Sequence, residues 1–138
     1  MNLQGYISPL SDRYGSDNMH VIWSEINKIT TWRGLWYVLA ESQKELGVGS
    51  ISYSQLEEMK NAITKIDFNS IKNHESMTKH DVVANLLAYG DVAPDAKSIM
   101  HLGATSQFIV DNAESIMIRD AIAILSLIHI SEPTRQAE

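Results

Sequence analysis

Two adjacent hydroxyl side chains, Thr105 and Ser106, stand directly before a long helical pattern, in the segment "HLGATS" at residues 101–106. One hydroxyl is sufficient to cap a helix, and such a cap contributes about 1 kcal/mol. The second hydroxyl, with Gly103 allowing close approach of the backbone, fits a carboxylate bound at the positive end of the helix. The segment therefore predicts either a simple cap or an anion site.

A second candidate is Arg13-Tyr14, which follows "ISPLSD" near the start of the chain. A guanidinium group next to a phenol suits a phosphate, because both groups donate hydrogen bonds and the guanidinium adds a planar charge. The alternative is a surface arginine beside a partly buried tyrosine.

A third candidate is Lys79-His80-Asp81, at the start of another helical pattern. A cation, an imidazole and free backbone N–H groups meet where an anion is favoured. The alternative is a solvated helix start, with Asp81 stabilised by the positive end of the helix dipole.

The remaining histidines considered and the three tryptophans are expected to have structural roles. His20 and His74 have no partners at metal-ligand spacing, so we expect surface or interface histidines. Trp23, Trp32 and Trp36 are expected in the core, and they do not indicate a cofactor stack.

Composition limits the classes of protein to which the chain can belong. The 138 residues suffice for one domain with a modest core. The net charge is -6 with 11 basic residues and no basic stripe, which disfavours nucleic-acid binding. The chain has no cysteine, which excludes disulfides and cysteine-type zinc sites. No apolar run of membrane-spanning length is present, so a cytoplasmic protein is expected.

The segments around the three candidate sites are all predicted to be helical, so the predicted fold class is all-α. Apolar residues recur at helical spacing, and no segment alternates long enough to indicate a strand. We expect residues 1–16 to form a loop and residues 91–104 to be rich in turns. Helices are predicted over about 18–28, 31–46, 54–66, 68–76, 78–90 and 106–125.

Cap residues mark the predicted helix starts. Thr30 or Thr31 is expected to cap the second helix, whose apolar face extends to Leu46 before Gly47 ends it. Ser54-Gln55-Leu56-Glu57 has the spacing of a capping box. Asp67 and Thr78 are the expected caps of the two helices that follow.

The last predicted helix lacks a partner of its own length. Its 20 or so residues extend about 30 Å, and no long helix follows it in the chain. We therefore expect the chain either to oligomerise or to be a fragment of a larger protein.

Taken in order, four segments resemble the N-terminal part of the adenylosuccinate lyase family, within the fumarase and aspartase superfamily. The resemblance covers roughly residues 5–125, and "HLGATS" followed by "DN" is its most specific part. The family usually has Arg-His-Asp where this chain has Lys79-His80-Asp81. A guanidinium group that can donate two parallel hydrogen bonds is thus replaced by a compact ammonium group. The segments are "SPLSDRYGS", "TWRGLWYVLAESQKELG", "KHDVVANLLAYG" and "IMHLGATSQFIVDNAE".

The resemblance implies a role for each candidate. Arg13-Tyr14 matches the family's pair that holds the nucleotide phosphate. Lys79-His80-Asp81 matches its second substrate-binding segment. Thr105-Ser106 matches the pair that contacts the succinyl moiety, later fumarate, so the two hydroxyls would form a carboxylate cradle.

The family cleaves adenylosuccinate to AMP and fumarate, and also cleaves the succinylated imidazole carboxamide ribotide of purine synthesis, with no metal or organic cofactor. The reaction is a β-elimination that needs an acid and a base. In the family, the principal acid and the serine base would align past residue 138. His80 is therefore interpreted as substrate-binding and assisting, and the chain alone is expected to be inactive.

The family's fold implies a domain division. Residues 1–104 would form an N-terminal helical domain, and residues 105–125 would begin the central helical bundle. Four central domains form a homotetramer whose active sites each draw on three subunits. Two alternatives stay open: another lyase of the superfamily, such as argininosuccinate lyase, against which Arg13-Tyr14 argues, and a non-catalytic helical assembly or ligand-binding protein.

The tail "SLIHISEPTRQAE", residues 126–138, departs abruptly from the resemblance. Ser126 to Arg135 match the translation of a transposase-type sequencing-library adaptor, so we expect a non-native tail. The alternative is a divergent native C-terminus. The helix is expected to continue some way into "SLIHI" and to fray at Ser131-Glu132-Pro133.

Overall fold

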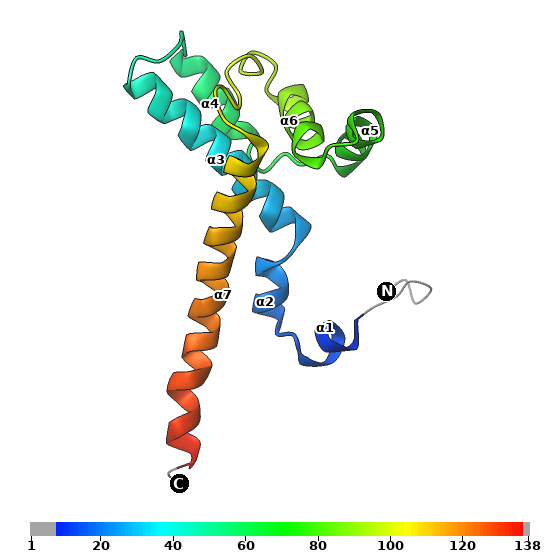
Figure 1. Ribbon diagram of the computed structural model, residues 1–138, viewed down its shortest axis with the longest axis vertical. Helices are drawn as coiled ribbons and strands as arrows, with labels where there is room; N and C mark the ends of the chain where they lie inside the picture. Colours follow the sequence, from blue (N-terminus) through cyan, green and yellow to red (C-terminus); the bar gives the residue numbers. More distant parts are fainter. Residues whose placement is uncertain (1–7, 137–138) are drawn as a thin grey trace.

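The computed structural model describes residues 8–136, and the side chains of this range as far as Leu127. These residues form helices joined by turns, without a strand, which confirms the predicted all-α class (Figure 1). The helices are α1 (Pro9–Tyr14), α2 (Asp17–Ile22), α3 (Glu25–Glu45), α4 (Tyr53–Ala62), α5 (Phe68–Thr78), α6 (Asp81–Val92) and α7 (Ser106–Gln136).

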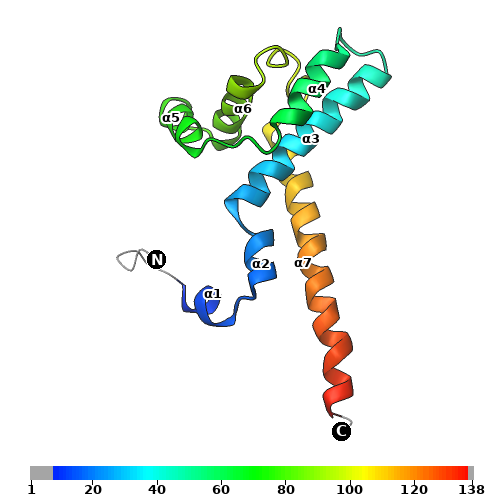
Figure 2. The same cartoon turned by 180° about the vertical axis from the view of Figure 1, so that it is seen from behind.

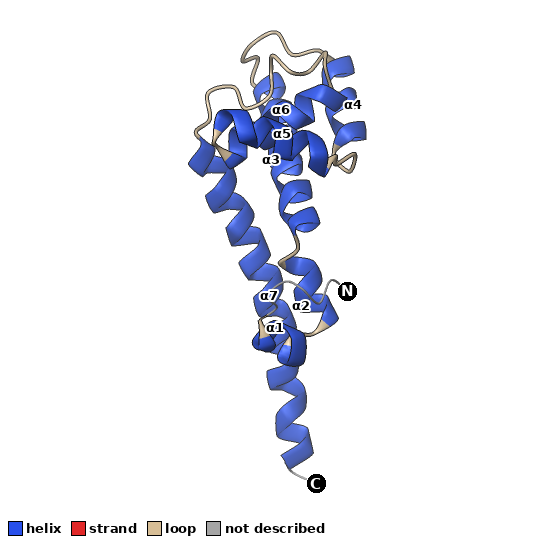
Figure 3. Ribbon diagram, turned by 90° about the vertical axis from the view of Figure 1, so that its right-hand side faces the viewer, coloured by secondary structure: helices blue, strands red, loops and turns tan. Residues whose placement is uncertain are grey.

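The helices are arranged as a packed head and a long limb. The head consists of α3, α4, α5 and α6, and the start of α7 packs against α3 and α6 within it (Figure 1). From there α7 runs away from the head, with α2 beside its first half (Figure 2). Figure 3 shows the far end of α7 extending beyond the other helices.

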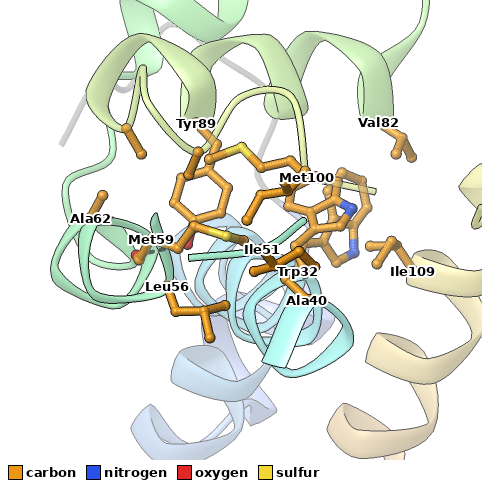
Figure 4. Packing of buried hydrophobic residues seen from close by; sticks show 14 of the residues in the cluster. Trp32, Ala40, Ile51, Leu56, Met59, Ala62, Val82, Tyr89, Met100 and Ile109 are labelled. Atoms are coloured by element: carbon orange, nitrogen blue, oxygen red, sulfur yellow. Dashed lines mark hydrogen bonds between the residues drawn. The ribbon is translucent and has the colours of Figure 1, made fainter. Parts of the chain in front are cut away.

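The core of the head is centred on Trp36 of α3, which is fully buried. Its ring meets that of Trp32 edge-on at a centroid distance of 6.3 Å and stacks on Tyr89 of α6 at 6.1 Å. Figure 4 shows the core side chains gathered between α3, α4, α6 and α7. Burial of large aromatic rings dominates the energetics of a core this small.

The predicted helix over 18–28 is wrong, because the chain breaks at Trp23 and Ser24. The side chain of Ser16 accepts the Met19 N–H and caps α2, and the side chain of Ser24 accepts the Asn27 N–H and caps α3. Two serine caps a short distance apart stop one helix and start the next. Thr30 and Thr31, the predicted caps, lie inside α3.

Two further cap predictions need correction. The capping box of α4 is formed by Ser52 and Gln55, two residues before the predicted one. Thr78 is the last residue of α5, and His80 is the N-cap of α6. Asp67 accepts the N–H groups of Asn69 and Ser70, which confirms the predicted cap of α5.

Burial was predicted correctly for most of α3 and wrongly at its two ends. Trp32 and Trp36 are buried, whereas Trp23 is 51% exposed and Leu46 is 79% exposed. Trp23 lies at the break between α2 and α3, and Leu46 follows the last turn of α3. Helical periodicity places residues on a face only where the helix itself continues.

The predicted loop over 1–16 contains α1 within its described part. Pro9 occupies the first turn of this helix, where its missing N–H costs nothing. Residues 1–7 of the predicted loop lie outside the described range.

α7 is 31 residues long and continues past Pro133 to Gln136, so the predicted fraying at Ser131-Glu132-Pro133 is wrong. A proline removes one backbone donor, and this one stands only a turn from the helix end. One face of α7 is buried through Ile109, Ala113, Met117 and Ala121. Other large apolar residues of α7 are exposed, namely Phe108, Ile118, Ile122, Leu125 and Leu127.

Candidate functional site

The turn that starts α7 separates the roles of its two hydroxyls. Thr105 Oγ1 accepts the backbone N–H of Phe108 at 3.3 Å, so Thr105 is the cap. The half-buried Ser106 is the first residue of α7, and its hydroxyl makes no hydrogen bond to any other described residue. Ser106 is therefore a free donor at the positive end of a long helix.

Long-range hydrogen bonds hold this turn on α3. Trp36 Nε1 donates to His101 Nδ1 at 2.9 Å, and Gln43 Nε2 donates to the Leu102 carbonyl at 2.8 Å. His101 and Gly103 have φ values of 62° and 69°, so the backbone turns sharply through the left-handed region. The residues before Ser106 are thus fixed to the aromatic core.

His101 is a residue that the sequence analysis did not single out. Burial lowers the pKa of its imidazole, which favours the neutral form. Because Nδ1 accepts the indole N–H, the neutral ring carries its proton on Nε2. A non-glycine residue at positive φ beside a glycine turn is a signal that only the folded backbone reveals.

The start of α6 carries Lys79-His80-Asp81 on an exposed turn. Lys79 has a φ of 53° and ends α5. His80 Nδ1 accepts the Val83 N–H over a long 3.5 Å, and Asp81 Oδ1 accepts the Val82 N–H at 2.8 Å. Two of the three side chains therefore already serve the free N–H groups of the first turn.

Arg13 and Tyr14 end the short helix α1, and both are exposed, Tyr14 to 78%. The partly buried tyrosine of the structural alternative is therefore not observed. Tyr14 lines a shallow hollow of about 340 Å³ together with His20 and Trp23 of the α2 region. Its hydroxyl and the guanidinium of Arg13 are both available to a ligand arriving from solvent.

The structure does not join the three clusters within one chain. Among residues 8–136, no hydrogen bond or ion pair connects any two of them. Figure 1 shows α1 near the start of α2, away from the head, and α6 within the head.

Comparison with known proteins links these features to one family. The chain is 41% identical over 122 residues to adenylosuccinate lyase from Saccharomyces cerevisiae, which covers 87% of this chain and 25% of that protein. It is 44% identical over 116 residues to the enzyme of the same name from Caenorhabditis briggsae, covering 83% and 24%. The match to that from Methanocaldococcus jannaschii is 38% over 122 residues, covering 86% and 26%.

The chain belongs to the adenylosuccinate lyase family. It spans about a quarter of the length of the curated relatives that it matches. No family model matches the chain. Among solved structures, β-carboxy-cis,cis-muconate cycloisomerase from Acinetobacter calcoaceticus is similar, with 29% identity and a TM-score of 0.62 over 79% of this chain and 27% of that one. That enzyme belongs to the fumarase and aspartase superfamily, which agrees with the predicted fold.

A polar cluster on α5 and α6 of this family member was missed by the sequence analysis. Asp91 Oδ2 accepts hydrogen bonds from His74 Nε2 at 2.7 Å and from Ser70 Oγ at 2.9 Å. The bond from His74 and, to a smaller extent, the one from Ser70 hold the pKa of Asp91 below its usual range. Serine and histidine both donate to one carboxylate, so the cluster ties α5 to α6 and does not activate a nucleophile.

Two observations concern other kinds of site. Among the described residues, no three His, Asp or Glu side chains lie close enough together to hold a metal ion. Within the same range, no helix is both long and apolar enough to cross a membrane.

Proposed function

We propose that this chain supplies substrate-binding segments of an enzyme that eliminates fumarate from adenylosuccinate to give AMP. The same enzyme would cleave the succinylated imidazole carboxamide ribotide, and would act in the cytoplasm as a homotetramer when full-length. Membership of the adenylosuccinate lyase family supports the proposal, because the names of the relatives specify the substrate class.

The free hydroxyl of Ser106 is the observation that carries the proposal. During the elimination, negative charge builds on the carboxylate next to the carbon that loses its proton. A donor held in place beforehand stabilises that charge without reorganising during the reaction. Thr105 uses its hydroxyl as the cap, and the bonds from Trp36 and Gln43 fix the turn, so Ser106 is such a donor.

The other two clusters complete the assignment. Arg13-Tyr14 would hold the nucleotide phosphate, which suits an exposed guanidinium and phenol. Lys79-His80-Asp81 would bind the substrate from the start of α6. His80 Nδ1 faces the Val83 N–H, so Nε2 is the atom available to a substrate, in an assisting role.

The separation of the clusters supports a site shared between subunits, with residues 1–104 as a helical domain and 105–125 as the start of the bundle. We propose that the catalytic acid and base come from outside these 138 residues. The purified chain alone should therefore release no fumarate from adenylosuccinate, and measurable release would contradict this part of the proposal.

A chimera tests the carboxylate cradle. In it, this chain replaces the matched quarter of the yeast relative. Ser106→Ala should lower kcat for adenylosuccinate cleavage by about 10²–10³-fold, the usual cost of one donor to a developing oxyanion. Ser115→Ala is the matched control, because Ser115 is an exposed serine on the same helix that bonds only the Asp111 carbonyl. Equal kcat values for the chimera and its Ser106→Ala variant would show that Ser106 does not stabilise the carboxylate, and the Thr105 cap would be the only role left for the two hydroxyls.

A further inference from the structure

A cleft of about 540 Å³ lies in the head, and its walls come from the N-terminal parts of α3, α5 and α6. Asn85 of α6 lines it, together with charged side chains from all three helices. These are Glu25, Lys28, Lys72, Glu75 and Asp81.

Asn85 is the unusual residue of this cleft. The residue is only 5% exposed, and its side-chain amide nitrogen donates to the Asp81 carbonyl at 3.0 Å. A carbonyl only accepts, so the nitrogen must face Asp81 and the oxygen must point the other way. Asn85 Oδ1 has no hydrogen-bond partner. Leaving such a buried acceptor unpaired costs about 1–3 kcal/mol, so the site is short of a donor.

The charges around the cleft favour a cationic donor. Lys28 Nζ and Glu25 Oε1 neutralise each other at 2.8 Å. Glu75 makes no ion pair with any described residue, and the only basic side chain within 4.0 Å of the Asp81 carboxylate among the described residues is the imidazole of His80, at 3.5 Å. Lys72 likewise has no acidic partner within 4.0 Å among the described residues. Two carboxylates and one ammonium group thus remain, which leaves one negative charge in excess.

We propose that this cleft binds small molecules that carry a primary ammonium group, with Asn85 Oδ1 accepting one of the ammonium hydrogens. The unpaired amide oxygen supplies the acceptor, and Glu75 and Asp81 supply the opposite charge. The remainder of such a molecule would lie against Phe68, which is 47% exposed at the edge of the cleft.

The oxygen exposes less than 1 Å², so the cleft must widen slightly to admit the donor. α5 buries only Ile71 among its described residues, so the cleft would widen between α5 and the first turn of α3. The hydrogen bonds of Ser70 and His74 to Asp91 would keep α5 on α6 during this movement. A wall with few buried apolar contacts moves at a low free-energy cost.

The test is a titration of the ¹⁵N-labelled 138-residue chain with methylammonium chloride, followed by NMR. The Asn85 side-chain amide and the amides of Phe68 to Glu75 should shift in a saturable manner. Tetramethylammonium chloride is the matched probe, because it has the same charge and no N–H donor. Equal shifts with both cations, or no saturable shift with methylammonium, would overturn the proposal.

Two variants locate the site. Asn85→Leu should abolish saturable binding, whereas Asn61→Leu, the same substitution at an exposed asparagine of α4, should not. Lys72→Gln removes the like charge from an exposed position and should tighten binding about two- to fivefold. Thermal unfolding shows whether Asn85→Leu folds. If it does not, an unchanged affinity in Lys72→Gln still overturns the assignment. Binding is measured in this chain alone, so the result does not depend on the proposed lyase activity.

Discussion

The turns that start α6 and α7 both carry a histidine and further polar side chains, but different hydrogen bonds stabilise them. Each follows a residue at positive φ, Lys79 in one and His101 in the other. The turn before α6 is stabilised by its own neighbours, since His80 and Asp81 accept N–H groups within three residues of themselves. The turn before α7 is stabilised by α3, through bonds that span 65 and 59 residues.

The comparison shows that a turn whose backbone is held by another helix can leave a polar side chain free to bind a ligand. At α7 the core fixes the backbone and Thr105 provides the cap, so the Ser106 hydroxyl is left without an internal partner. At α6 the polar side chains themselves do the capping and are 45% and 63% exposed. The α7 turn is therefore preorganised, and the α6 turn can adjust to a ligand.

The largest expected change in stability comes from removing Trp36, which anchors the α7 turn to α3. Trp36→Ala removes a fully buried ring and the indole N–H that holds His101, and should lower the free energy of unfolding by about 3–5 kcal/mol. Guanidinium denaturation of the purified chain measures this. Trp23→Ala is the control, because Trp23 is half exposed and should cost far less. Equal losses for the two variants would show that the turn is not anchored through Trp36.

A smaller effect separates the two caps. Thr105→Ala should cost about 1 kcal/mol of unfolding free energy, as is typical for the loss of a threonine cap. His80→Ala should cost less than about 0.5 kcal/mol, because its bond to the Val83 N–H is long and the side chain is exposed. The same denaturation measurement applies. A larger loss in His80→Ala would reverse the comparison.

The smallest effect is a pH dependence that belongs to the α7 turn. Burial lowers the pKa of His101 in the folded chain, so the unfolded chain binds its proton more readily. The stability that His101 contributes is present above its unfolded pKa, near 6.5, and is lost as the pH falls through the lower folded pKa.

Denaturation midpoints at pH values from about 7.5 to 5.5 test this range, which lies above the one where Asp91 titrates. His101→Asn is the control, since asparagine tolerates positive φ and its carbonyl can accept the Trp36 N–H. The original chain should lose more stability on acidification than this variant. Parallel curves would exclude a contribution from His101.

Local signals in the sequence were sufficient for much of the fold. The all-α class, the cap Asp67 and the start of α7 at Ser106 followed from short-range spacing and were confirmed. Errors of two residues occurred where several serines or threonines compete to cap one helix, as at Ser52 and Ser54. Which hydroxyl caps depends on the backbone angles, and those depend on what the helix packs against.

The candidate site was predicted in part. The sequence singled out Thr105-Ser106 but could not say which hydroxyl is free, because that depends on a bond to Phe108 in the folded turn. His101, and the cluster of His74, Asp91 and Ser70, were missed because their partners are distant in the sequence. The resemblance to the family supplied roles for residues, whereas the long-range bonds that position them came only from the structure.

The length of α7 has a consequence for measurements in solution. At 1.5 Å per residue its 31 residues extend about 46 Å. A compact chain of 138 residues has a radius of gyration of about 14 Å. Because much of α7 projects beyond the head, X-ray scattering from a monomer should give a larger radius and a pair-distance distribution with a long tail toward high distances (Figure 3). Its profile would be that of a rod attached to a sphere.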